Sequence, residues 1–209
     1  MVSSPVPTRE DYYRTLAGIL PEKTLVITSL GNASYLWASL QNRAENFYIE
    51  DCMGLALPLA LGVAAALPKR KVVCAEGDGG LLMHLGTLVT TGAVSPKNLT
   101  VFVAQNNVYA SSGGQPLNQK QLDLAGLARM AGFQYTENIS SVKTFKDSLL
   151  KTLDREGPTL LALAMEPDPQ IVVPPFPFNP IVIKQKFMGA IEAPAYVPSR
   201  FEKGIKVTP

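Results

Sequence analysis

Short apolar segments alternate with amphipathic ones along most of the chain. The apolar runs at 24–29, 71–76, 99–105 and 159–165 are rich in Val, Ile, Leu and Ala and show little polar alternation. Such runs are typical of parallel strands that are buried on both faces. Helices are expected at 8–20, 35–41, 53–67, 81–92, 123–131 and 142–155, with shorter strands at 47–49 and 133–136. The pattern predicts an α/β fold with a doubly wound, mostly parallel sheet and right-handed crossovers.

The character of the sequence changes at Pro167. Nine of the 17 prolines fall after residue 166, and only a patch near 183–191 looks helical. A segment this rich in proline is not expected to form a second core. We therefore expect an α/β domain over 1–166, followed over 167–209 by an extended Pro-rich tail with one short helix.

Composition narrows the functional classes. Charged residues make up 17% of the chain and the formal net charge is +2, whereas an average soluble protein is about 25% charged. Disorder is not expected from this composition, and neither is nucleic-acid binding, because no basic block is present. The shortage of charge suggests a surface that is buried against another subunit. The helix at 53–67, which is apolar nearly all round, is the first candidate for that surface.

Nothing in the sequence predicts a membrane or secretory protein. The longest apolar stretch, 53–67, is shorter than the ~20 residues that span a bilayer. The opening residues, MVSSPVPTRED, carry no secretory signal. Two cysteines, Cys52 and Cys74, are too few for a disulfide framework. We expect a cytoplasmic protein with two reduced, buried thiols.

The segment Gly77-Asp78-Gly79-Gly80 directly follows the apolar strand at 71–76, which the charged Lys71 and Glu76 are expected to bound. Ligands of open α/β sheets bind at the carboxyl ends of strands, and glycines let the backbone approach them closely. The following helix start favours an anion. An acidic residue beside a phosphate makes chemical sense when a divalent cation lies between them. On its own, the segment is equally compatible with a tight turn.

A second polar signal, Asn106-Asn107, ends the next strand. Twenty-six residues separate Gly79 from Asn106, enough for one helix, a turn and a strand, so both segments should meet at one edge of the sheet. The Asp78 carboxylate, the Asn107 amide oxygen and the Tyr109 carbonyl would then supply three oxygen ligands for Mg²⁺. Diphosphate oxygens and water could complete an octahedron.

These motifs resemble those of a known enzyme family. GDG followed after some 26 residues by NN is similar to the cofactor motif of thiamine-diphosphate-dependent enzymes. The longer segments NFYIEDCMG, EGDGGLLMHLG and QNNVYASSGGQP resemble the cofactor-binding part of phosphonopyruvate decarboxylases and the β subunit of sulfopyruvate decarboxylases. The resemblance covers roughly 8–192 and implies the diphosphate-binding (PP-type) domain of the thiamine diphosphate-binding fold.

The resemblance implies roles for individual residues. The metal ligands would be Asp78, Asn107 and the Tyr109 carbonyl. The diphosphate would contact the loop of Ser29, Gly31 and Asn32 and the segment of Gly77, Gly79 and Gly80, with Ser111, Ser112 and Gly113 closing over diphosphate or substrate.

The resemblance also implies residues at the reacting end of the cofactor. Met53 would be the wedge that holds the two rings of the cofactor in a V, and the Asp51 carbonyl would accept a hydrogen bond from the 4′-amino group. His84, the single histidine, is either a structural residue or a proton shuttle of the active site. Two positions depart from the family: Asp51 stands where glycine is common, and Ala110 where phosphonopyruvate enzymes tend to be more polar.

One catalytic residue of the family is not expected in this chain. In the family, a separate pyrimidine-binding domain supplies the glutamate that protonates the cofactor, and no segment here is left to build that domain. The resemblance therefore implies the β-type subunit of a split decarboxylase, in a hetero-oligomer with a pyrimidine-binding α-type subunit. Its substrate would be a small 2-oxo acid resembling sulfopyruvate or phosphonopyruvate. Carboligation, acyl transfer, 2-oxo acid oxidation and a non-catalytic cofactor-binding module remain alternatives.

Overall fold

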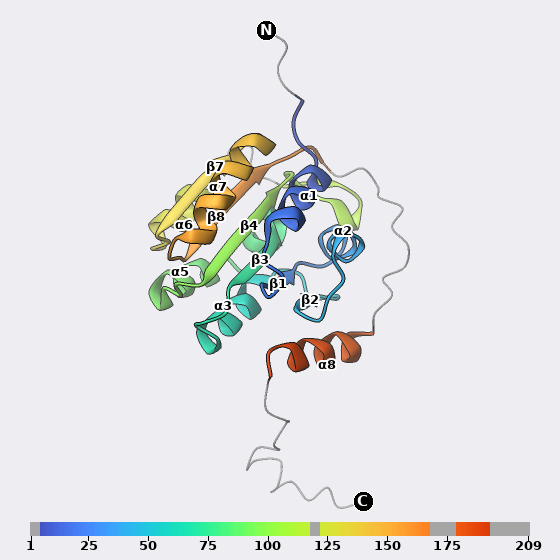
Figure 1. Cartoon of the computed structure of the whole chain (residues 1–209). Helices are drawn as coiled ribbons and strands as arrows, with labels where there is room; N and C mark the ends of the chain where they lie inside the picture. The colour runs from blue at the N-terminus through green and yellow to red at the C-terminus, as the bar shows by residue number, and fades with distance from the viewer. Residues whose placement is uncertain (1–4, 118–121, 168–178, 193–209) are drawn as a thin grey trace, which may run out of the picture.

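Six parallel strands form the centre of the protein. The structure, a computed structural model, describes residues 5–117, 122–167 and 179–192. The sheet has the strand order β2-β1-β3-β4-β8-β7, and every neighbouring pair in it is parallel (Figure 1). Its strands are β1 (Leu25–Thr28), β2 (Asn46–Tyr48), β3 (Val72–Gly77), β4 (Leu99–Gln105), β7 (Tyr135–Ile139) and β8 (Thr159–Ala164). The predicted doubly wound α/β fold is confirmed.

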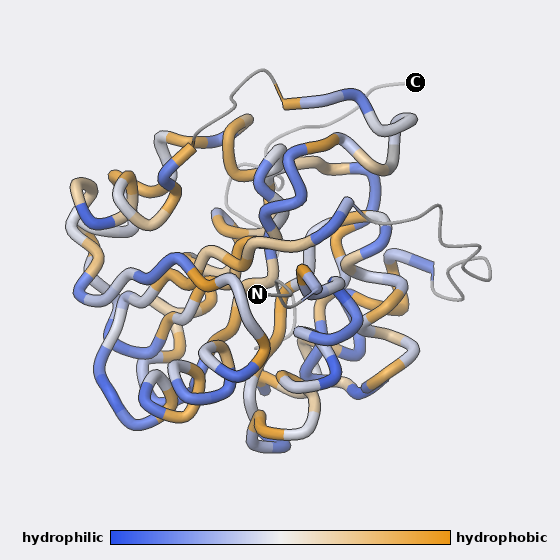
Figure 2. The backbone as a smooth tube through the Cα atoms, turned by 90° about the horizontal axis from the view of Figure 1, so that it is seen from above, coloured by the Kyte–Doolittle hydropathy of each residue, from blue (hydrophilic) through white to orange (hydrophobic). Residues whose placement is uncertain are grey.

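Helices cover both faces of this sheet. They are α1 (Arg9–Ile19), α2 (Asn32–Leu40), α3 (Ala56–Ala66), α4 (Asp78–Met83), α5 (Gly86–Val94), α6 (Leu124–Met130), α7 (Val142–Asp154) and α8 (Pro180–Ala190). One core lies under α1, α2 and α7 and the other under α3, α5 and α6. Alternate strand residues enter opposite cores, as Cys74 and Ala75 do, which explains why the strands read as continuous apolar runs. Figure 2 shows hydrophobic and hydrophilic stretches alternating along the chain, as expected when each helix turns one face to the sheet.

The strand order places a topological switch point between β1 and β3. From β1 the chain passes to β2 on one side, whereas β3 lies on the other side of β1 and leads on to β4. The connections that leave the carboxyl ends of β1 and β3 therefore diverge. Ligands of doubly wound sheets bind in the opening that such divergence leaves.

Two expected elements differ in the structure. The helix predicted at 81–92 is two helices, α4 and α5, separated at His84, where the backbone leaves helical geometry (φ −127°, ψ 41°). No proline marks this break, so periodicity could not reveal it. The strand predicted at 133–136 is β7 at Tyr135–Ile139, because Phe133 packs into a core after the turn at Gly132 (φ 101°) instead of pairing with β8.

A small hairpin after β4 was not expected. Strands β5 (Val108–Tyr109) and β6 (Gln115–Pro116) pair antiparallel around a 3₁₀ turn at Ala110–Ser112. Two-residue strands give no period-2 signal, so this hairpin cannot be seen in the hydrophobic pattern. It holds the segment after the Asn106-Asn107 pair above the carboxyl end of the sheet.

Part of the expected tail packs on the domain. In α8, Ile183 and Phe187 are buried, and the Phe187 ring meets Phe47 edge-to-face with ring centroids 5.4 Å apart. This contact fixes α8 against β2, at the edge of the sheet (Figure 1). The remaining expectation of an extended Pro-rich segment falls mostly on 168–178 and 193–209, outside the described residues.

The helix α3 is buried on one face only. Ala56, Leu57 and Ala60 belong to a core, while Gly62, Ala65 and Ala66 are exposed. The outer face of this apolar helix is therefore uncovered in the single chain.

Among the described residues, no helix is long and apolar enough to cross a membrane. The thiols also differ: Cys74 is buried, but Cys52 is exposed, contrary to the prediction for both.

Gly92 lies where α5 meets the end of α6. A Cβ placed on Gly92 would lie 1.6 Å from the Ala131 carbonyl oxygen, a backbone atom that cannot rotate away. We expect Gly92→Ala to lower the free energy of unfolding by about 1–3 kcal/mol or more. Gly86→Ala is the matched control, because no atom lies within 4 Å of a Cβ there. Urea unfolding of both variants measures the difference, and equal stabilities would contradict the close contact.

Candidate functional site

A small cavity opens at the switch point, above the carboxyl ends of β1 and β3. Its volume is about 60 Å³. Four loops that are distant in sequence meet there: those after β1, before α3, after β3 and after β4. The predicted residues that line it are Ser29, Asn32, Met53, Gly77, Asp78, Gly79, Gly80 and Tyr109. The cavity is also lined by three residues without a predicted role, Arg9, Ala33 and Val108. Three more lining residues belong to segments that the sequence singled out: Leu30 of the loop 29–32, Asn106 of the second motif, and Ala110.

Asp78 connects the two halves of the predicted motif. Its carboxylate accepts a hydrogen bond from the Gly79 amide (2.8 Å, Oδ1) and another from the Asn107 amide (2.7 Å, Oδ2). The side chain is 2% exposed. Burial raises the pKa of Asp78, while the amides of Asn107 and Gly79 and the charge of Arg9 lower it. The result is an oriented, largely desolvated carboxyl group that a bound cation would stabilise in its charged form.

The two asparagines lie differently. Asn106 is buried and lines the cavity, and its Oδ1 accepts a hydrogen bond from the Val108 amide (3.1 Å). Asn107 is exposed, has left-handed backbone geometry (φ 60°), and does not line the cavity. The Tyr109 carbonyl accepts hydrogen bonds from the Gly114 amide (2.9 Å) and, more weakly, from the Ser112 hydroxyl (3.4 Å) within the hairpin. A metal bound to this oxygen would replace the weaker of the two.

Close packing explains why glycines follow Asp78. A Cβ on Gly79 would lie 2.5 Å from the Tyr109 ring and 3.2 Å from Cε of Met53. A Cβ on Gly80 would lie 2.5 Å from Oε1 of Glu76. Side chains at these two positions would therefore fill the space in which the loops meet.

Glu76 is a buried acid, contrary to the prediction from the sequence. It was expected to bound the strand, but β3 continues to Gly77 and Glu76 is 0% exposed. Its Oε1 accepts a hydrogen bond from the Gly77 amide (2.9 Å). Burial raises the pKa of Glu76, and Ser29 together with the amides of Gly77, Leu57 and Ala56 lowers it. From the sequence alone, a charged residue at the end of an apolar strand can be either a buried acid or the exposed residue at which the strand ends.

The segment before α3 carries the residues predicted at the reacting end. Met53 lines the cavity, and Asp51 is exposed outside it. Asp51 has φ 53°, a conformation that favours glycine, which accounts for glycine being common at this position in the family. Burial, and then the charge of Asp51, raise the pKa of Glu50.

Three further predicted positions lie away from the cavity lining. His84 is exposed and packs against the loop before α3, since a Cβ on Gly54 would lie 2.6 Å from His84 Cδ2. Ser112 is exposed in the hairpin, where its hydroxyl meets Gln115 Oε1 (3.0 Å). Gly31 (φ 70°) directly precedes α2 without lining the cavity. Ser111 belongs to the 3₁₀ turn, and its side chain is outside the described part of the chain.

Comparisons with known proteins show the family to which the chain is related. Residues 29–163 match the family "Thiamine pyrophosphate enzyme, C-terminal TPP binding domain". The chain is 37% identical to a phosphonopyruvate decarboxylase of Streptomyces viridochromogenes over 77% of its own length and 40% of that protein. It is 30% identical to the sulfopyruvate decarboxylase subunit beta of Methanocaldococcus jannaschii, over 89% of this chain and 98% of that subunit.

Solved structures show the same fold. Benzoylformate decarboxylase from Polynucleobacter necessarius superposes with a TM-score of 0.69 at 16% identity, over 79% of this chain and 36% of that one. The chain thus spans about two fifths of the phosphonopyruvate decarboxylases that it matches, 40% and 41% of their lengths. It spans nearly the whole of the M. jannaschii beta subunit. With the family match extending from the end of β1 to β8, the chain belongs to the thiamine pyrophosphate enzymes, as a C-terminal TPP-binding domain.

Proposed function

We propose that this chain is the diphosphate-binding subunit of a split, thiamine-diphosphate-dependent 2-oxo acid decarboxylase that uses Mg²⁺. The observation that carries the proposal is the cavity at the switch point. There, Asp78 of the GDGG segment accepts a hydrogen bond from Asn107 of the second motif. The two halves of a cofactor motif, 26 residues apart in sequence, thus meet at one carboxylate.

The residues of the cavity fit a metal-bound diphosphate. Asp78 offers a buried carboxylate, and the segment after β4 offers amide and carbonyl oxygens, which are the hard donors that Mg²⁺ prefers. Without side chains, Gly79 and Gly80 let the loops of the site pack closely and leave their backbone amides uncovered by a Cβ. In the proposal, Asp78, Asn107 and the Tyr109 carbonyl hold the metal. The diphosphate is held by Ser29, Gly31, Asn32, Gly77, Gly79 and Gly80, with Ser111 and Ser112 closing over it.

The other assigned residues act at the reacting end. Thiamine diphosphate, when bound, supplies an electron sink for cleavage of the bond between the carboxylate and the keto carbon. Met53 would support the cofactor from below, and the Asp51 carbonyl would accept a hydrogen bond from its amino group. His84, one turn beyond the cavity, would carry a proton during turnover.

The names of the relatives support the substrate class. Phosphonopyruvate and sulfopyruvate are both small 2-oxo acids with an anionic group at carbon 3, and both appear in the names of relatives. We therefore propose a substrate of that kind, and an α-type partner that supplies the pyrimidine domain and its glutamate. A carboligase is the second candidate, because an acetolactate synthase large subunit of Mycobacterium tuberculosis is 29% identical over 56% of this chain.

Removal of the metal tests the binding half of the proposal. Without a cation, Asp78 and the diphosphate would face each other as like charges, and two unit charges 4 Å apart repel by about 4 kcal/mol at an effective dielectric of 20. Thiamine diphosphate should therefore bind in the presence of Mg²⁺ and lose at least ~100-fold in affinity when EDTA removes the metal. Calorimetric titration of the full chain measures this, and restored Mg²⁺ is the control. The same affinity with and without Mg²⁺ would contradict the metal site.

A further inference from the structure

Arg9 is a charged residue held inside the protein. It is the first residue of α1, is 6% exposed and lines the cavity at the switch point. Its guanidinium carbon lies 5.9 Å from the centroid of the Tyr13 ring. Arg9 therefore places a positive charge in the wall of this cavity.

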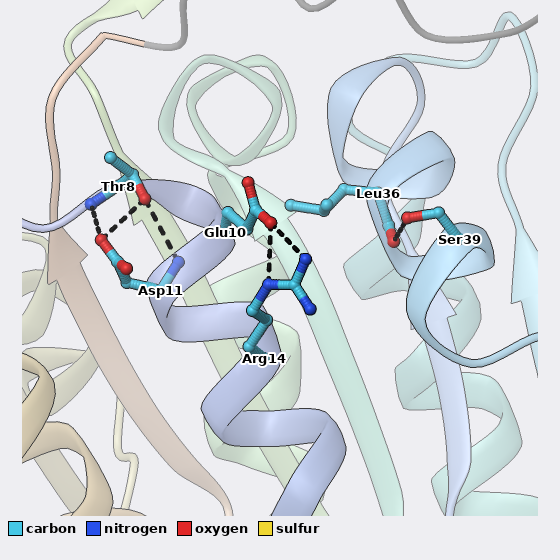
Figure 3. A network of polar contacts seen from close by, with 6 residues as sticks. All are labelled: Thr8, Glu10, Asp11, Arg14, Leu36 and Ser39. Atoms are coloured by element: carbon cyan, nitrogen blue, oxygen red, sulfur yellow. Dashed lines mark hydrogen bonds and ion pairs between the residues drawn. The ribbon is translucent and has the colours of Figure 1, made fainter.

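The first turn of α1 combines an ordered cap, an exposed ion pair and the buried Arg9. Thr8 caps the helix in a reciprocal arrangement with Asp11: the Asp11 amide donates to Thr8 Oγ1 (3.2 Å), and the Thr8 amide donates to Asp11 Oδ2 (2.9 Å) (Figure 3). Glu10 and Arg14 form an ion pair on the exposed side, with side chains 53% and 63% exposed. The exposed side of the helix start carries that pair, whereas Arg9 is buried and lines the cavity.

A bound diphosphate would leave an excess of negative charge in the cavity that Arg9 could balance. Asp78 and Arg9 are the two charged residues among those that line it. In the proposed function, one Mg²⁺ would have to balance both Asp78 and a diphosphate, which together carry more negative charge than the metal neutralises. A fixed cation within the same wall reduces that excess. Arg9 and Asp78 line the same cavity of about 60 Å³, so the guanidinium lies close to the proposed metal site.

A second element presents positive potential to the same space. The first turn of α2 supplies Asn32 and Ala33 to the cavity. Among the described residues, no side chain caps this nine-residue helix, whose N-cap is Gly31. Uncapped helix starts favour anions through their amides and the helix dipole. The helices α1 and α2 pack side by side, with the Tyr13 and Trp37 rings edge-to-face at 6.0 Å (Figure 1), so Arg9 and this helix start border one cavity.

We propose that Arg9 is a diphosphate-recognising residue, whose guanidinium donates hydrogen bonds to the cofactor's phosphate oxygens beside the metal. This inference rests on the proposed function, which assigns the diphosphate to this cavity. A guanidinium suits the role because its planar fork can contact two phosphate oxygens at once, whereas a lysine offers a single point charge. The N-terminal helix thus contributes to the site directly, although it precedes both motifs.

The test compares Arg9→Gln, Arg9→Lys and the control Arg14→Gln, all in the full chain with Mg²⁺. Thiamine diphosphate and inorganic pyrophosphate are titrated calorimetrically, and the melting temperature of each unliganded variant is recorded. For Arg9→Gln we expect both ligands to bind about 10- to 100-fold more weakly. Arg9→Lys should lose only part of that affinity, because the charge remains. Arg14→Gln, on the exposed side of α1, should bind like the unmodified chain.

Other outcomes overturn the inference in distinguishable ways. If Arg9→Gln binds both ligands as tightly as the unmodified chain, Arg9 has no role in recognition and the proposed function stands. If Arg9→Lys is as weak as Arg9→Gln and both melt at lower temperature, the role of Arg9 is structural. If the unmodified chain binds neither ligand with Mg²⁺ present, the proposed diphosphate site itself fails, and the assignment of Arg9 fails with it.

Discussion

Asp78→Asn should reduce the Mg²⁺-dependent affinity for thiamine diphosphate by about 1000-fold or more. The carboxylate is the acidic residue in the cavity wall, and the substitution removes the charge that would attract the metal at a site shielded from water. An interaction of about 4 kcal/mol between charges at such a site corresponds to roughly three powers of ten in affinity. Calorimetric titration in the presence of Mg²⁺, with and without EDTA, measures the loss.

The stability of the unliganded protein provides the first control for Asp78→Asn. Because burial raises the pKa of Asp78, the fold disfavours its charged form, and a neutral amide of the same size relieves that cost. The amide oxygen can still accept one of the two backbone hydrogen bonds. We therefore expect the melting temperature to change by no more than about 4 °C, an amount that corresponds to roughly 1 kcal/mol for a domain of this size.

A second control separates this site from a general effect of removing a carboxylate. Asp147→Asn changes an exposed acid on α7, outside the cavity lining, and should leave binding unchanged. If Asp78→Asn kept the Mg²⁺-dependent affinity of the unmodified chain, Asp78 would not be a metal ligand. The proposed ligand set around it would then have to be abandoned.

The features that could be predicted from the sequence are those that require particular residue types at consecutive positions. Buried parallel strands need continuous apolar residues, so β3, β4 and β8 were visible as runs, and the residues after a strand's carboxyl end were the natural place to look for Asp78. Glycine is required at the next two positions, because a Cβ at either would lie 2.5 Å from a neighbouring side chain. Such requirements leave a residue-type signal that a single sequence can show.

Arg9 and Glu76 were missed because their burial depends on tertiary packing. An arginine after a helix cap and a glutamate at a strand end are equally compatible with solvent exposure. Arg9 reaches the cavity only because α1 crosses beside α2, and Glu76 is enclosed only because the start of α3 covers it. Neither relation is encoded in local periodicity. The break at His84 and the hairpin after β4 were missed for the same reason.

Exposed apolar side chains beside the site indicate where a partner would bind. Apolar side chains are exposed on α4, α5 and the start of α3, including Met83 (55%), Val89 (63%) and Leu55 (37%). Together with the uncovered outer face of α3, they place apolar surface near the segment that carries Met53. Exposed apolar patches next to a functional site are typical of interaction surfaces. In the proposed split enzyme, this surface is where we expect the α-type subunit to bind.

Mutual dependence of the two subunits is the strongest prediction about activity. The isolated chain, given thiamine diphosphate and Mg²⁺, should release no measurable CO₂ from sulfopyruvate or phosphonopyruvate. Adding a pyrimidine-domain subunit should raise the rate by at least ~10²–10⁴-fold, the usual contribution of a positioned acid–base group such as the glutamate it would supply. Coupled measurement of CO₂ release with each subunit alone and with both together provides the test. Decarboxylation by the isolated chain would contradict the split-enzyme proposal.

Two methionine substitutions connect that activity to the surface. Met83→Asp places a charge on the apolar surface beside the site, whereas Met130→Asp places the same charge on α6, where Met130 is 87% exposed. Because a charge desolvated in an interface costs several kcal/mol without a partner, Met83→Asp should weaken both co-purification of the subunits and the activity of the mixture. Met130→Asp should leave both unchanged. Since neither residue lines the cavity, both variants should still bind thiamine diphosphate. If both variants co-purified equally well with the partner, the partner would bind another face.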